Sequence, residues 1–200
     1  PAAASFKHVS PAGAGVAVPL TPLEAQAYEM DAERLAALTP TALAYVRARN
    51  ADPMCSFGDF TAVSEVVDVK TAQFLKTEVS DGIVALGFEP EALEILKAKK
   101  SGAFICLQAD ASFFPPDVEY REVYGMGFMQ RRNDRLLTEK DLGDVKTKNA
   151  LPEDAKRDLL LASIAIKYTQ SNSVGYAKGG QVVGVGAGQQ SRVDCVKLAG

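Results

Sequence analysis

Short apolar segments that suit β-strands alternate along this chain with segments of helical spacing, and this alternation constrains the fold more than any other feature. Residues 5–9, 83–86 and 103–107 read as strands, whereas residues 41–48 and 90–100 have the spacing and end signals of helices. Strands that alternate with helices are typical of α/β proteins. We therefore predict an α/β fold.

Turn signals separate these segments. Ser10-Pro11-Ala12-Gly13 and Ser80-Asp81-Gly82 are rich in turn-forming residues, and we expect a turn at each. Residues 173–177 and 181–185 predict a β-hairpin, because the paired glycines between them supply the positive φ of a tight turn. Residues 119–130 alternate well enough to predict one longer strand.

A polar, charged stretch over residues 131–150 is the best candidate for a boundary. We predict a first lobe over residues 1–134, a linker over 135–150 and the start of a second lobe over 151–200. Residues 6–10 and 166–170 echo each other, each at the end of an apolar element, which hints at a duplicated fold. Because the chain begins at Pro1, we expect it to be an internal piece of a longer protein.

Charge and cysteine content argue against several classes of protein. The net charge of −3 disfavours a protein that coats nucleic acid, and no apolar run is long enough to cross a membrane. Three widely spaced cysteines and one histidine give poor support for a zinc site, so we expect no zinc. We expect buried free thiols and a reducing compartment, the cytosol.

The single histidine, His8, is the strongest candidate for proton transfer. An imidazole beside the ammonium of Lys7 has its protonated form disfavoured, which suits a general base near neutral pH. Adjacent residues of a strand point to opposite faces of the sheet. Both side chains can therefore serve one site only if the strand has ended by Lys7.

The glycine-rich residues 184–188 do not match a dinucleotide-binding motif, since Gln189 occupies the place of its third glycine. We predict a turn that opens a helix, where free N–H groups and Arg192 could hold an anion or a planar polar group. The run of hydroxyls and amides over residues 167–173 suggests a polar ligand site or an alkali-metal site of oxygen ligands.

Several blocks of sequence together resemble one family. They are SFKHVSPAG at 5–13, SFGDF at 56–60, EVSDGI at 78–83, KYTQSNSV at 167–174 and GAGQQSR at 186–192. This pattern is similar to the AICAR transformylase region of the AICAR formyltransferase/IMP cyclohydrolase family and extends over essentially all 200 residues. The Ser-Pro-Ala-Gly form of the first block looks like the eukaryotic branch.

The resemblance implies a cytidine-deaminase-like fold: three αβα layers around a mixed sheet, here one lobe and the start of a second. It implies transfer of a formyl group from 10-formyltetrahydrofolate to the 5-amino group of AICAR, in purine biosynthesis. Catalytic roles fall on Lys7, His8 and Asn172. AICAR contacts fall on Phe57, Gly58, Asp81 and Asn172, folate contacts on Arg192 and Val193, and a potassium site on Ile166, Thr169, Ser171 and Ser173.

The family's active site forms across a homodimer interface, and its members are bifunctional. We therefore expect a homodimer of a longer enzyme, with no nucleic acid or membrane as partner, and little or no activity from these 200 residues alone. The alternative is a non-catalytic binding or oligomerisation module that kept the fold. Retention of Lys7, His8, Asn172 and Arg192 together favours the enzyme.

Overall fold

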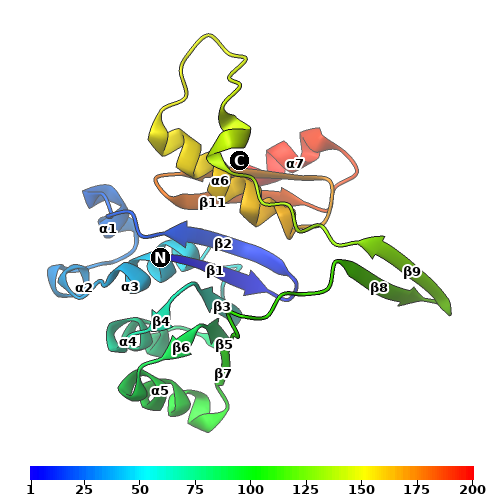
Figure 1. Cartoon of the computed structure of the whole chain (residues 1–200). Helices are drawn as coiled ribbons and strands as arrows, with labels where there is room; N and C mark the ends of the chain where they lie inside the picture. The colour runs from blue at the N-terminus through cyan, green and yellow to red at the C-terminus, as the bar shows by residue number, and fades with distance from the viewer.

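The computed structural model describes every residue from Pro1 to Gly200, and its helices and strands alternate along the chain as the sequence predicts (Figure 1). The strands are β1 (Ala2–Lys7), β2 (Ser10–Val16), β3 (Asp59–Val63), β4 (Val66–Val67), β5 (Ser80–Ala85), β6 (Gly87–Phe88), β7 (Ile105–Gln108), β8 (Val118–Val123), β9 (Met126–Arg131), β10 (Ser173–Lys178) and β11 (Gln181–Ala187). The α-helices are α1 (Pro22–Ala27), α2 (Ala32–Ala36), α3 (Pro40–Asn50), α4 (Val69–Thr77), α5 (Pro90–Lys97), α6 (Glu153–Lys167) and α7 (Arg192–Ala199). Short 3₁₀ turns cover Lys99–Gly102 and Glu139–Leu142.

Seven strands form one mixed sheet in the order β10-β11-β2-β1-β3-β5-β7. The pairs β3/β5 and β5/β7 are parallel, and the other neighbours in this sheet are antiparallel. The end of β1 and the beginnings of β3 and β5 consequently meet at one edge of the sheet. The predicted α/β class is confirmed.

Helices flank both faces of this sheet. Gly13 and Gly15 of β2 lie directly beneath α3, and Gly184 and Gly186 of β11 lie beneath α7. On the opposite face, Val182 of β11 packs with side chains of α6. The main core lies between α3, α4, α5 and the sheet, where Leu75, Ile83 and Leu96 are among the fully buried residues.

Two hairpins of the sheet have the same construction. Lys7 pairs with Ser10 across the turn between β1 and β2, and Lys178 pairs with Gln181 across the turn between β10 and β11. Both hairpins also skip one residue at the same place in the second strand, Ala12 in β2 and Val183 in β11. The repeated unit is therefore a hairpin backed by a helix, with Lys7 matching Lys178.

This match differs from the echo in the sequence, which paired residues 6–10 with residues 166–170. That pairing is wrong, because residues 166–170 include the end of helix α6 and not the end of a strand. The predicted hairpin over residues 173–185 is confirmed, and both Gly179 and Gly180 have positive φ at its turn.

Three local predictions are also wrong. Residues 10–13 begin strand β2 rather than a turn, since the turn comes earlier, at His8 and Val9. Residues 80–82 likewise begin strand β5. Residues 119–130 form a hairpin of two strands, because Tyr124 and Gly125 both adopt positive φ and reverse the chain.

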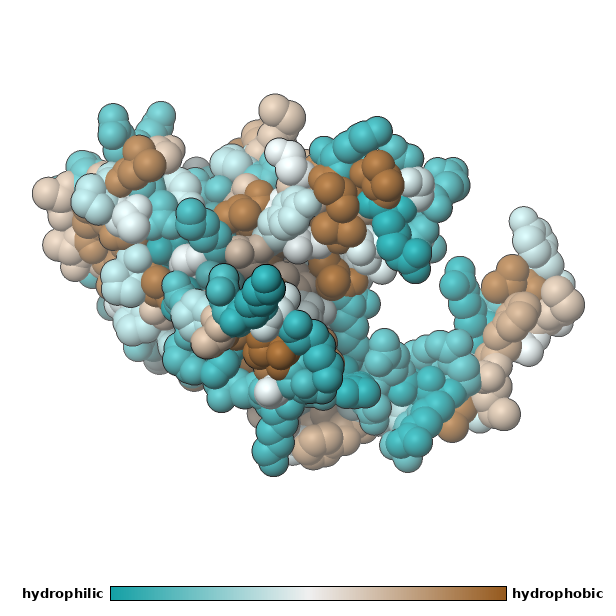
Figure 2. All heavy atoms as spheres, turned by 90° about the horizontal axis from the view of Figure 1, so that it is seen from above, coloured by the Kyte–Doolittle hydropathy of each residue, from teal (hydrophilic) through white to brown (hydrophobic).

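The β8–β9 hairpin stands away from the rest of the molecule, on the right in Figures 1 and 2. Apolar and polar side chains are mixed along it, and Tyr120 and Met129, which pair across the strands, are both exposed. The following residues 132–152 contain only a short 3₁₀ turn, in agreement with their polar composition. None of the helices combines the length and apolar character that crossing a lipid bilayer requires.

The buried side chain of Arg47, in α3, links the hairpin of β10 and β11, called here the second hairpin of the sheet, to residues 18–24. The Arg47 guanidinium donates to the carboxylate of Glu24 at 2.9 and 3.1 Å and to the carbonyl oxygens of Val18 and Pro19. The side chain of Gln181, in β11, accepts from Arg47 and donates back to its carbonyl oxygen at 2.8 Å. Helix α3 and strand β11 are therefore held together by polar contacts.

Glu24 makes this arrangement sensitive to acid. Its hydrogen bonds with Arg47 lower the pKa of its carboxyl from 4.5 to about 2. The stabilisation is complete above the ordinary pKa and disappears as pH falls from about 4.5 towards 2.

We predict that Glu24→Gln lowers the free energy of unfolding at pH 7 and flattens its pH dependence between 4.5 and 2. Hydrogen bonds to charged groups contribute about 1.5–3 kcal/mol, which urea unfolding at several pH values can resolve. The control Glu33→Gln changes an exposed glutamate with no ion pair and should have little effect. A Glu24→Gln protein with the same acid dependence as the parent would contradict the assignment.

Candidate active site

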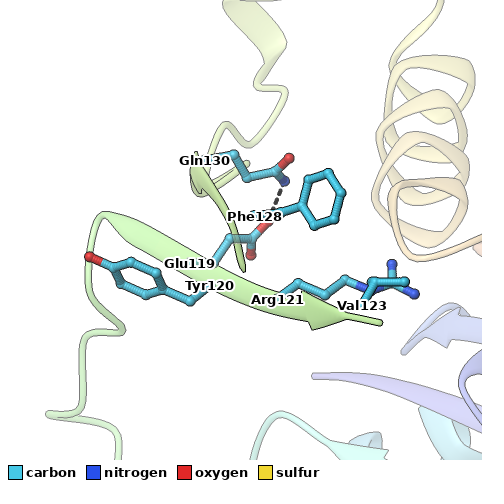
Figure 3. Close-up of a pocket in the computed structure, with 6 residues that line it drawn as sticks. All are labelled: Glu119, Tyr120, Arg121, Val123, Phe128 and Gln130. Atoms are coloured by element: carbon cyan, nitrogen blue, oxygen red, sulfur yellow. Dashed lines mark hydrogen bonds between the residues drawn. The ribbon is translucent and has the colours of Figure 1, made fainter. Parts of the chain in front are cut away.

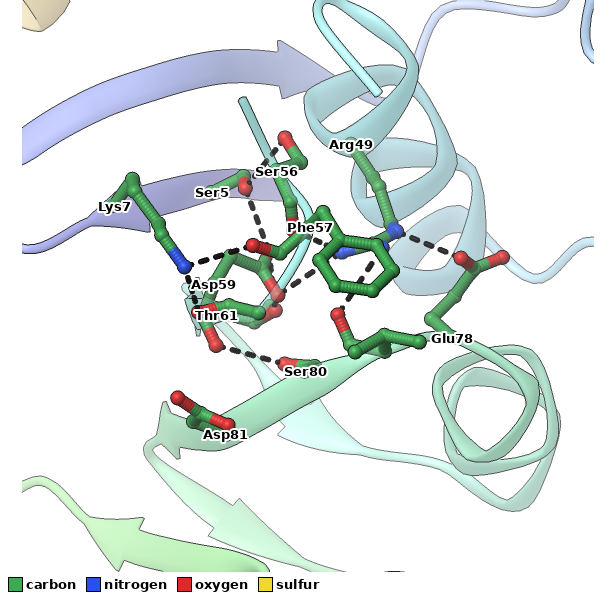
Figure 4. A network of polar contacts seen from close by, with 12 residues as sticks. Ser5, Lys7, Arg49, Ser56, Phe57, Asp59, Thr61, Glu78, Ser80 and Asp81 are labelled. Carbon is green, nitrogen blue, oxygen red and sulfur yellow. Dashed lines mark hydrogen bonds and ion pairs between the residues drawn. The ribbon is translucent and has the colours of Figure 1, made fainter. Parts of the chain in front are cut away.

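The ammonium group of Lys7 lies in a small polar site at the end of β1. Its Nζ atom donates to the carbonyl oxygens of Phe57 at 2.8 Å and Gly58 at 2.9 Å (Figure 4). Gly58 has φ of +70°, and a Cβ at this position would lie 3.0 Å from the Lys7 Nζ atom. The turn before β3 therefore suits glycine on two counts, its backbone conformation and the close approach of Lys7.

The residues beneath this turn form a buried polar network. Arg49 of α3 donates to the carbonyl oxygen of Ser56 at 2.7 Å and to the carboxylate of Asp59 at 3.0 Å. The same carboxylate accepts from the hydroxyl of Ser5 at 2.6 Å. Because the single proton of the Ser5 hydroxyl is used there, Ser5 accepts from the hydroxyl of Ser56 at 2.8 Å. Asp59 is fully buried, and the surrounding donors compensate for the desolvation of its charge.

Residues 54–57 predict a short strand that ends in a turn at Gly58 and Asp59. The strand is wrong, whereas the turn is correct at Gly58 and wrong at Asp59. Residues 51–58 are turns, and strand β3 begins at Asp59. The buried network explains the difference, because the Asp59 side chain is held inward by Arg49 and Ser5 rather than used in a surface turn.

Asp81, the second residue of β5, lies near Lys7 at the same edge of the sheet (Figure 4). It forms an ion pair of 2.5 Å with Lys100, whose hydrogen bond lowers the pKa of the Asp81 carboxyl. The charge of Lys7 acts in the same direction. A carboxylate has about four acceptor positions, so this pair leaves acceptors of Asp81 free for ligand hydroxyls.

His8 follows directly after the last residue of β1. It is exposed, has φ of +56°, and its side chain forms no hydrogen bond within the chain. The strand therefore ends at Lys7, which is the condition the sequence analysis set for both side chains to serve one site.

Asn172 joins two loops of the second hairpin. Its side-chain Nδ2 atom donates to the carbonyl oxygens of Gln189 and Gln190, each at 3.1 Å. Its main-chain carbonyl oxygen accepts from the Cys195 thiol. The Oδ1 atom of Asn172 accepts no hydrogen bond within the chain. One acceptor is thus free for a ligand while the amide nitrogen holds the side chain in place.

Arg192 and Val193 are the first residues of helix α7, which Ser191 caps. Both side chains are exposed. The glycine-rich turn predicted before this helix is only partly correct. Gly184 and Gly186 lie within strand β11, where any larger residue would clash with the backbone of α7. Only Gly188, with φ of +70°, belongs to the turn.

The four residues of the predicted potassium site are only partly brought together by hydrogen bonds. The hydroxyl of Thr169 donates to the carbonyl oxygen of Ile166 at 2.7 Å, so these two oxygens are adjacent at the end of α6. Ser173 begins strand β10, and neither it nor Ser171 forms a side-chain hydrogen bond. The structure contains no group of three or more His, Cys, Asp and Glu side chains suited to a metal ion.

The cysteines differ in exposure. Cys195 is buried as expected, Cys106 is half-buried and Cys55 is exposed, and all three are free. The prediction of three buried thiols is therefore wrong for Cys55. It lies in the turn before β3, where a hydrogen bond with the Asp52 carboxylate raises the pKa of its thiol.

Two hollows of similar size differ in what lines them. One, of about 550 Å³, is lined by residues from the segments 7–55 and 183–200, including Lys7, Asp52, Cys55 and Val185. The other, of about 520 Å³, is lined only by the β8–β9 hairpin, where Gln130 and Glu119 share a hydrogen bond (Figure 3). None of the predicted site residues lines the second hollow, whereas Lys7 lines the first.

The predicted site residues thus form two groups within one chain. Lys7, Phe57, Gly58 and Asp81 gather where β1 ends and β3 and β5 begin, with His8 next to Lys7. Asn172, Arg192 and Val193 gather between the second hairpin and α7. No hydrogen bond of the chain joins the two groups.

Comparison with known proteins agrees with the resemblance. The model of the family described as "AICARFT/IMPCHase bienzyme" matches residues 1–200. The chain belongs to this family. It is 34% identical over 157 residues to the bifunctional purine biosynthesis protein PurH of Acetivibrio thermocellus, a match that covers 78% of this chain and 30% of that protein. It is 36% identical over 157 residues to PurH of Cereibacter sphaeroides, covering 78% of this chain and 29% of that protein. The matched region thus spans less than a third of these relatives.

Sequence reasoning missed Arg49 as part of the site. The available signal was two arginines, Arg47 and Arg49, within the otherwise apolar helix α3. Charged side chains on such a helix need buried partners, and the structure supplies them as Glu24 and Asp59.

We predict that Asn172→Asp destabilises the second hairpin more than Asn172→Ala. The aspartate would place oxygen against the carbonyl oxygens of Gln189 and Gln190, whereas alanine only removes two donors, each worth about 0.5–1.5 kcal/mol. Amide hydrogen exchange in the 188–195 segment measures the difference. Equal exchange in both variants would mean that the amide nitrogen does not hold these loops together.

Proposed function

We propose that this chain forms part of the catalytic centre of an enzyme that transfers a formyl group from 10-formyltetrahydrofolate to the 5-amino group of AICAR. The complete protein would also have IMP cyclohydrolase activity, as the family's description indicates. The observation that carries the proposal is the position of Lys7 against the Phe57–Gly58 turn, with Asp81 beside it, in a chain that matches the family throughout.

The reaction requires proton transfer and charge stabilisation. The amine nitrogen of AICAR attacks the formyl carbon, and the bond from that carbon to N10 of the folate breaks. The amine loses one proton, and N10 gains one. His8, exposed at the end of β1, accepts the proton of the attacking amine. A weakly nucleophilic amine depends on this step, because conjugation with the ring withdraws its electron pair.

Lys7 stabilises the negative charge that develops on the formyl oxygen. An ammonium group has three donors, and two of those of Lys7 are used by the Phe57 and Gly58 carbonyls. The third is free for the ligand, and its direction is set by the other two. Preorganised donors of this kind reduce the reorganisation needed in the transition state.

The remaining substrate contacts follow from free polar atoms. The Asp81 carboxylate accepts from ribose hydroxyls, and the free Oδ1 atom of Asn172 accepts an N–H of the AICAR amine and orients its nitrogen. Arg192 and Val193, exposed at the start of α7, contact the folate. We further propose a potassium ion near Ile166, Thr169, Ser171 and Ser173.

We propose that the site is completed across a homodimer interface, since no hydrogen bond within one chain joins the two groups of residues. The matched hairpins support a cytidine-deaminase-like fold, with lobes over residues 1–134 and 151–200. A cytosolic location suits the three free thiols. The competing proposal is a non-catalytic module. Turnover distinguishes the two, because only an enzyme has a formyl-transfer rate that falls when the proton-accepting side chain is removed.

We predict that His8→Ala in the full-length enzyme lowers the rate constant of formyl transfer by ~10²–10⁴-fold, the usual contribution of acid–base catalysis. AICAR affinity should change little, because ribose is held by Asp81. Steady-state assays with saturating AICAR, together with calorimetric binding, separate the two effects. Normal turnover by His8→Ala would remove His8 from the mechanism. A wild-type enzyme that binds AICAR without any turnover would favour the non-catalytic module.

A further inference from the structure

We infer that Arg49 is a positioning residue for the nucleotide site, meaning the AICAR contacts Phe57, Gly58 and Asp81. Arg49 holds the Phe57–Gly58 turn at the distance from Asp81 that AICAR requires. This inference rests on the proposed function and adds a residue that none of the motifs includes. Arg49 lies on α3, is nearly fully buried, and acts through the turn rather than by touching substrate.

The guanidinium of Arg49 contacts the chain segments on both sides of the site. It donates to Ser56 and Asp59, which precede and begin β3. It also donates to the Glu78 carboxylate at 2.8 Å and to the Val79 carbonyl oxygen at 3.2 Å, directly before β5 (Figure 4). The segments that carry Phe57–Gly58 and Asp81 are therefore fixed to one rigid group.

The turn itself depends on the same atoms. The N–H of Gly58 donates to the carbonyl oxygen of Val79 at 2.9 Å, the oxygen that Arg49 also contacts. The carbonyl oxygens of Phe57 and Gly58 in turn hold Lys7. A shift of the Arg49 guanidinium would thus move the turn, the Lys7 ammonium and the start of β5 relative to one another.

Only a planar group with several fixed donors can make these contacts together. Arginine has five N–H donors in a rigid fork, whereas lysine has three donors on one rotating atom. Arg49→Lys keeps a positive charge near the buried Asp59 carboxylate but cannot reach Ser56, Glu78 and Val79 at the same time. The substitution therefore separates charge compensation from positioning.

The chain provides a matched control in Arg47, two residues earlier on the same helix. Arg47 is also buried, also pairs with a glutamate and also donates to two backbone carbonyl oxygens, those of Val18 and Pro19. Its partners lie towards β11 and not towards the 56–58 turn. Arg47→Lys should therefore disturb the fold to a similar degree without moving the 56–58 turn, Lys7 or the start of β5.

The experiment measures AICAR affinity by calorimetry, the KM for AICAR and kcat, and urea unfolding, for full-length wild-type enzyme, Arg49→Lys and Arg47→Lys. We expect Arg49→Lys to weaken AICAR binding tenfold or more and raise its KM similarly. Arg47→Lys should lose clearly less AICAR affinity than Arg49→Lys at a comparable loss of stability. Equal AICAR affinity in Arg49→Lys and wild type, or equal losses in both variants, would overturn the inference.

A second variant covers the case in which Arg49→Lys does not fold. Glu78→Gln removes one charged partner of Arg49 at a partly exposed position, so the fold should survive. We expect a rise of a few-fold in the KM for AICAR with unchanged folate KM, and an unchanged AICAR KM would contradict the inference. Failure of wild-type enzyme to bind AICAR would instead refute the proposed function.

Discussion

The buried ion pair between Arg49 and Asp59 is the interaction on which the candidate site depends. Breaking a buried pair by removing one partner costs about 3–5 kcal/mol, because the remaining charge is left without compensation. Here the pair is supported by Ser5 from β1, Ser56 from the preceding turn and Glu78 from the end of α4. These contacts come from separate segments, so a single network determines where β1, β3 and β5 meet.

The second constraint is the close packing of helices on the glycine-bearing strands. Gly13 and Gly15 allow α3 to lie against β2, and Gly184 and Gly186 allow α7 to lie against β11. Because α3 carries Arg49 and α7 begins with Arg192, this packing places one arginine of the proposed site on each helix. The same hairpin-and-helix unit is thus used twice, once for each group of site residues.

The sequence predicted the α/β class, the helices over residues 41–48 and 90–100 and the hairpin over residues 173–185, because their signals are local: spacing of apolar residues, helix caps and paired glycines. It misplaced the turns at residues 10–13 and 80–82, since small residues in those segments serve strand pairing and helix packing instead. The family motifs indicated Lys7, Phe57, Gly58 and Asp81, which the fold brings to one edge. The Arg49 network could not be predicted, because its partners are joined only by tertiary structure.

We propose that AICAR binds where β1 ends and β3 and β5 begin. Amide hydrogen exchange of the full-length enzyme, with and without AICAR and in the absence of folate, tests this directly. We predict slower exchange in residues 56–59 and 80–82 on addition of AICAR, with little change in the β8–β9 hairpin. Protection confined to other parts of the chain, with none at these two segments, would contradict the account.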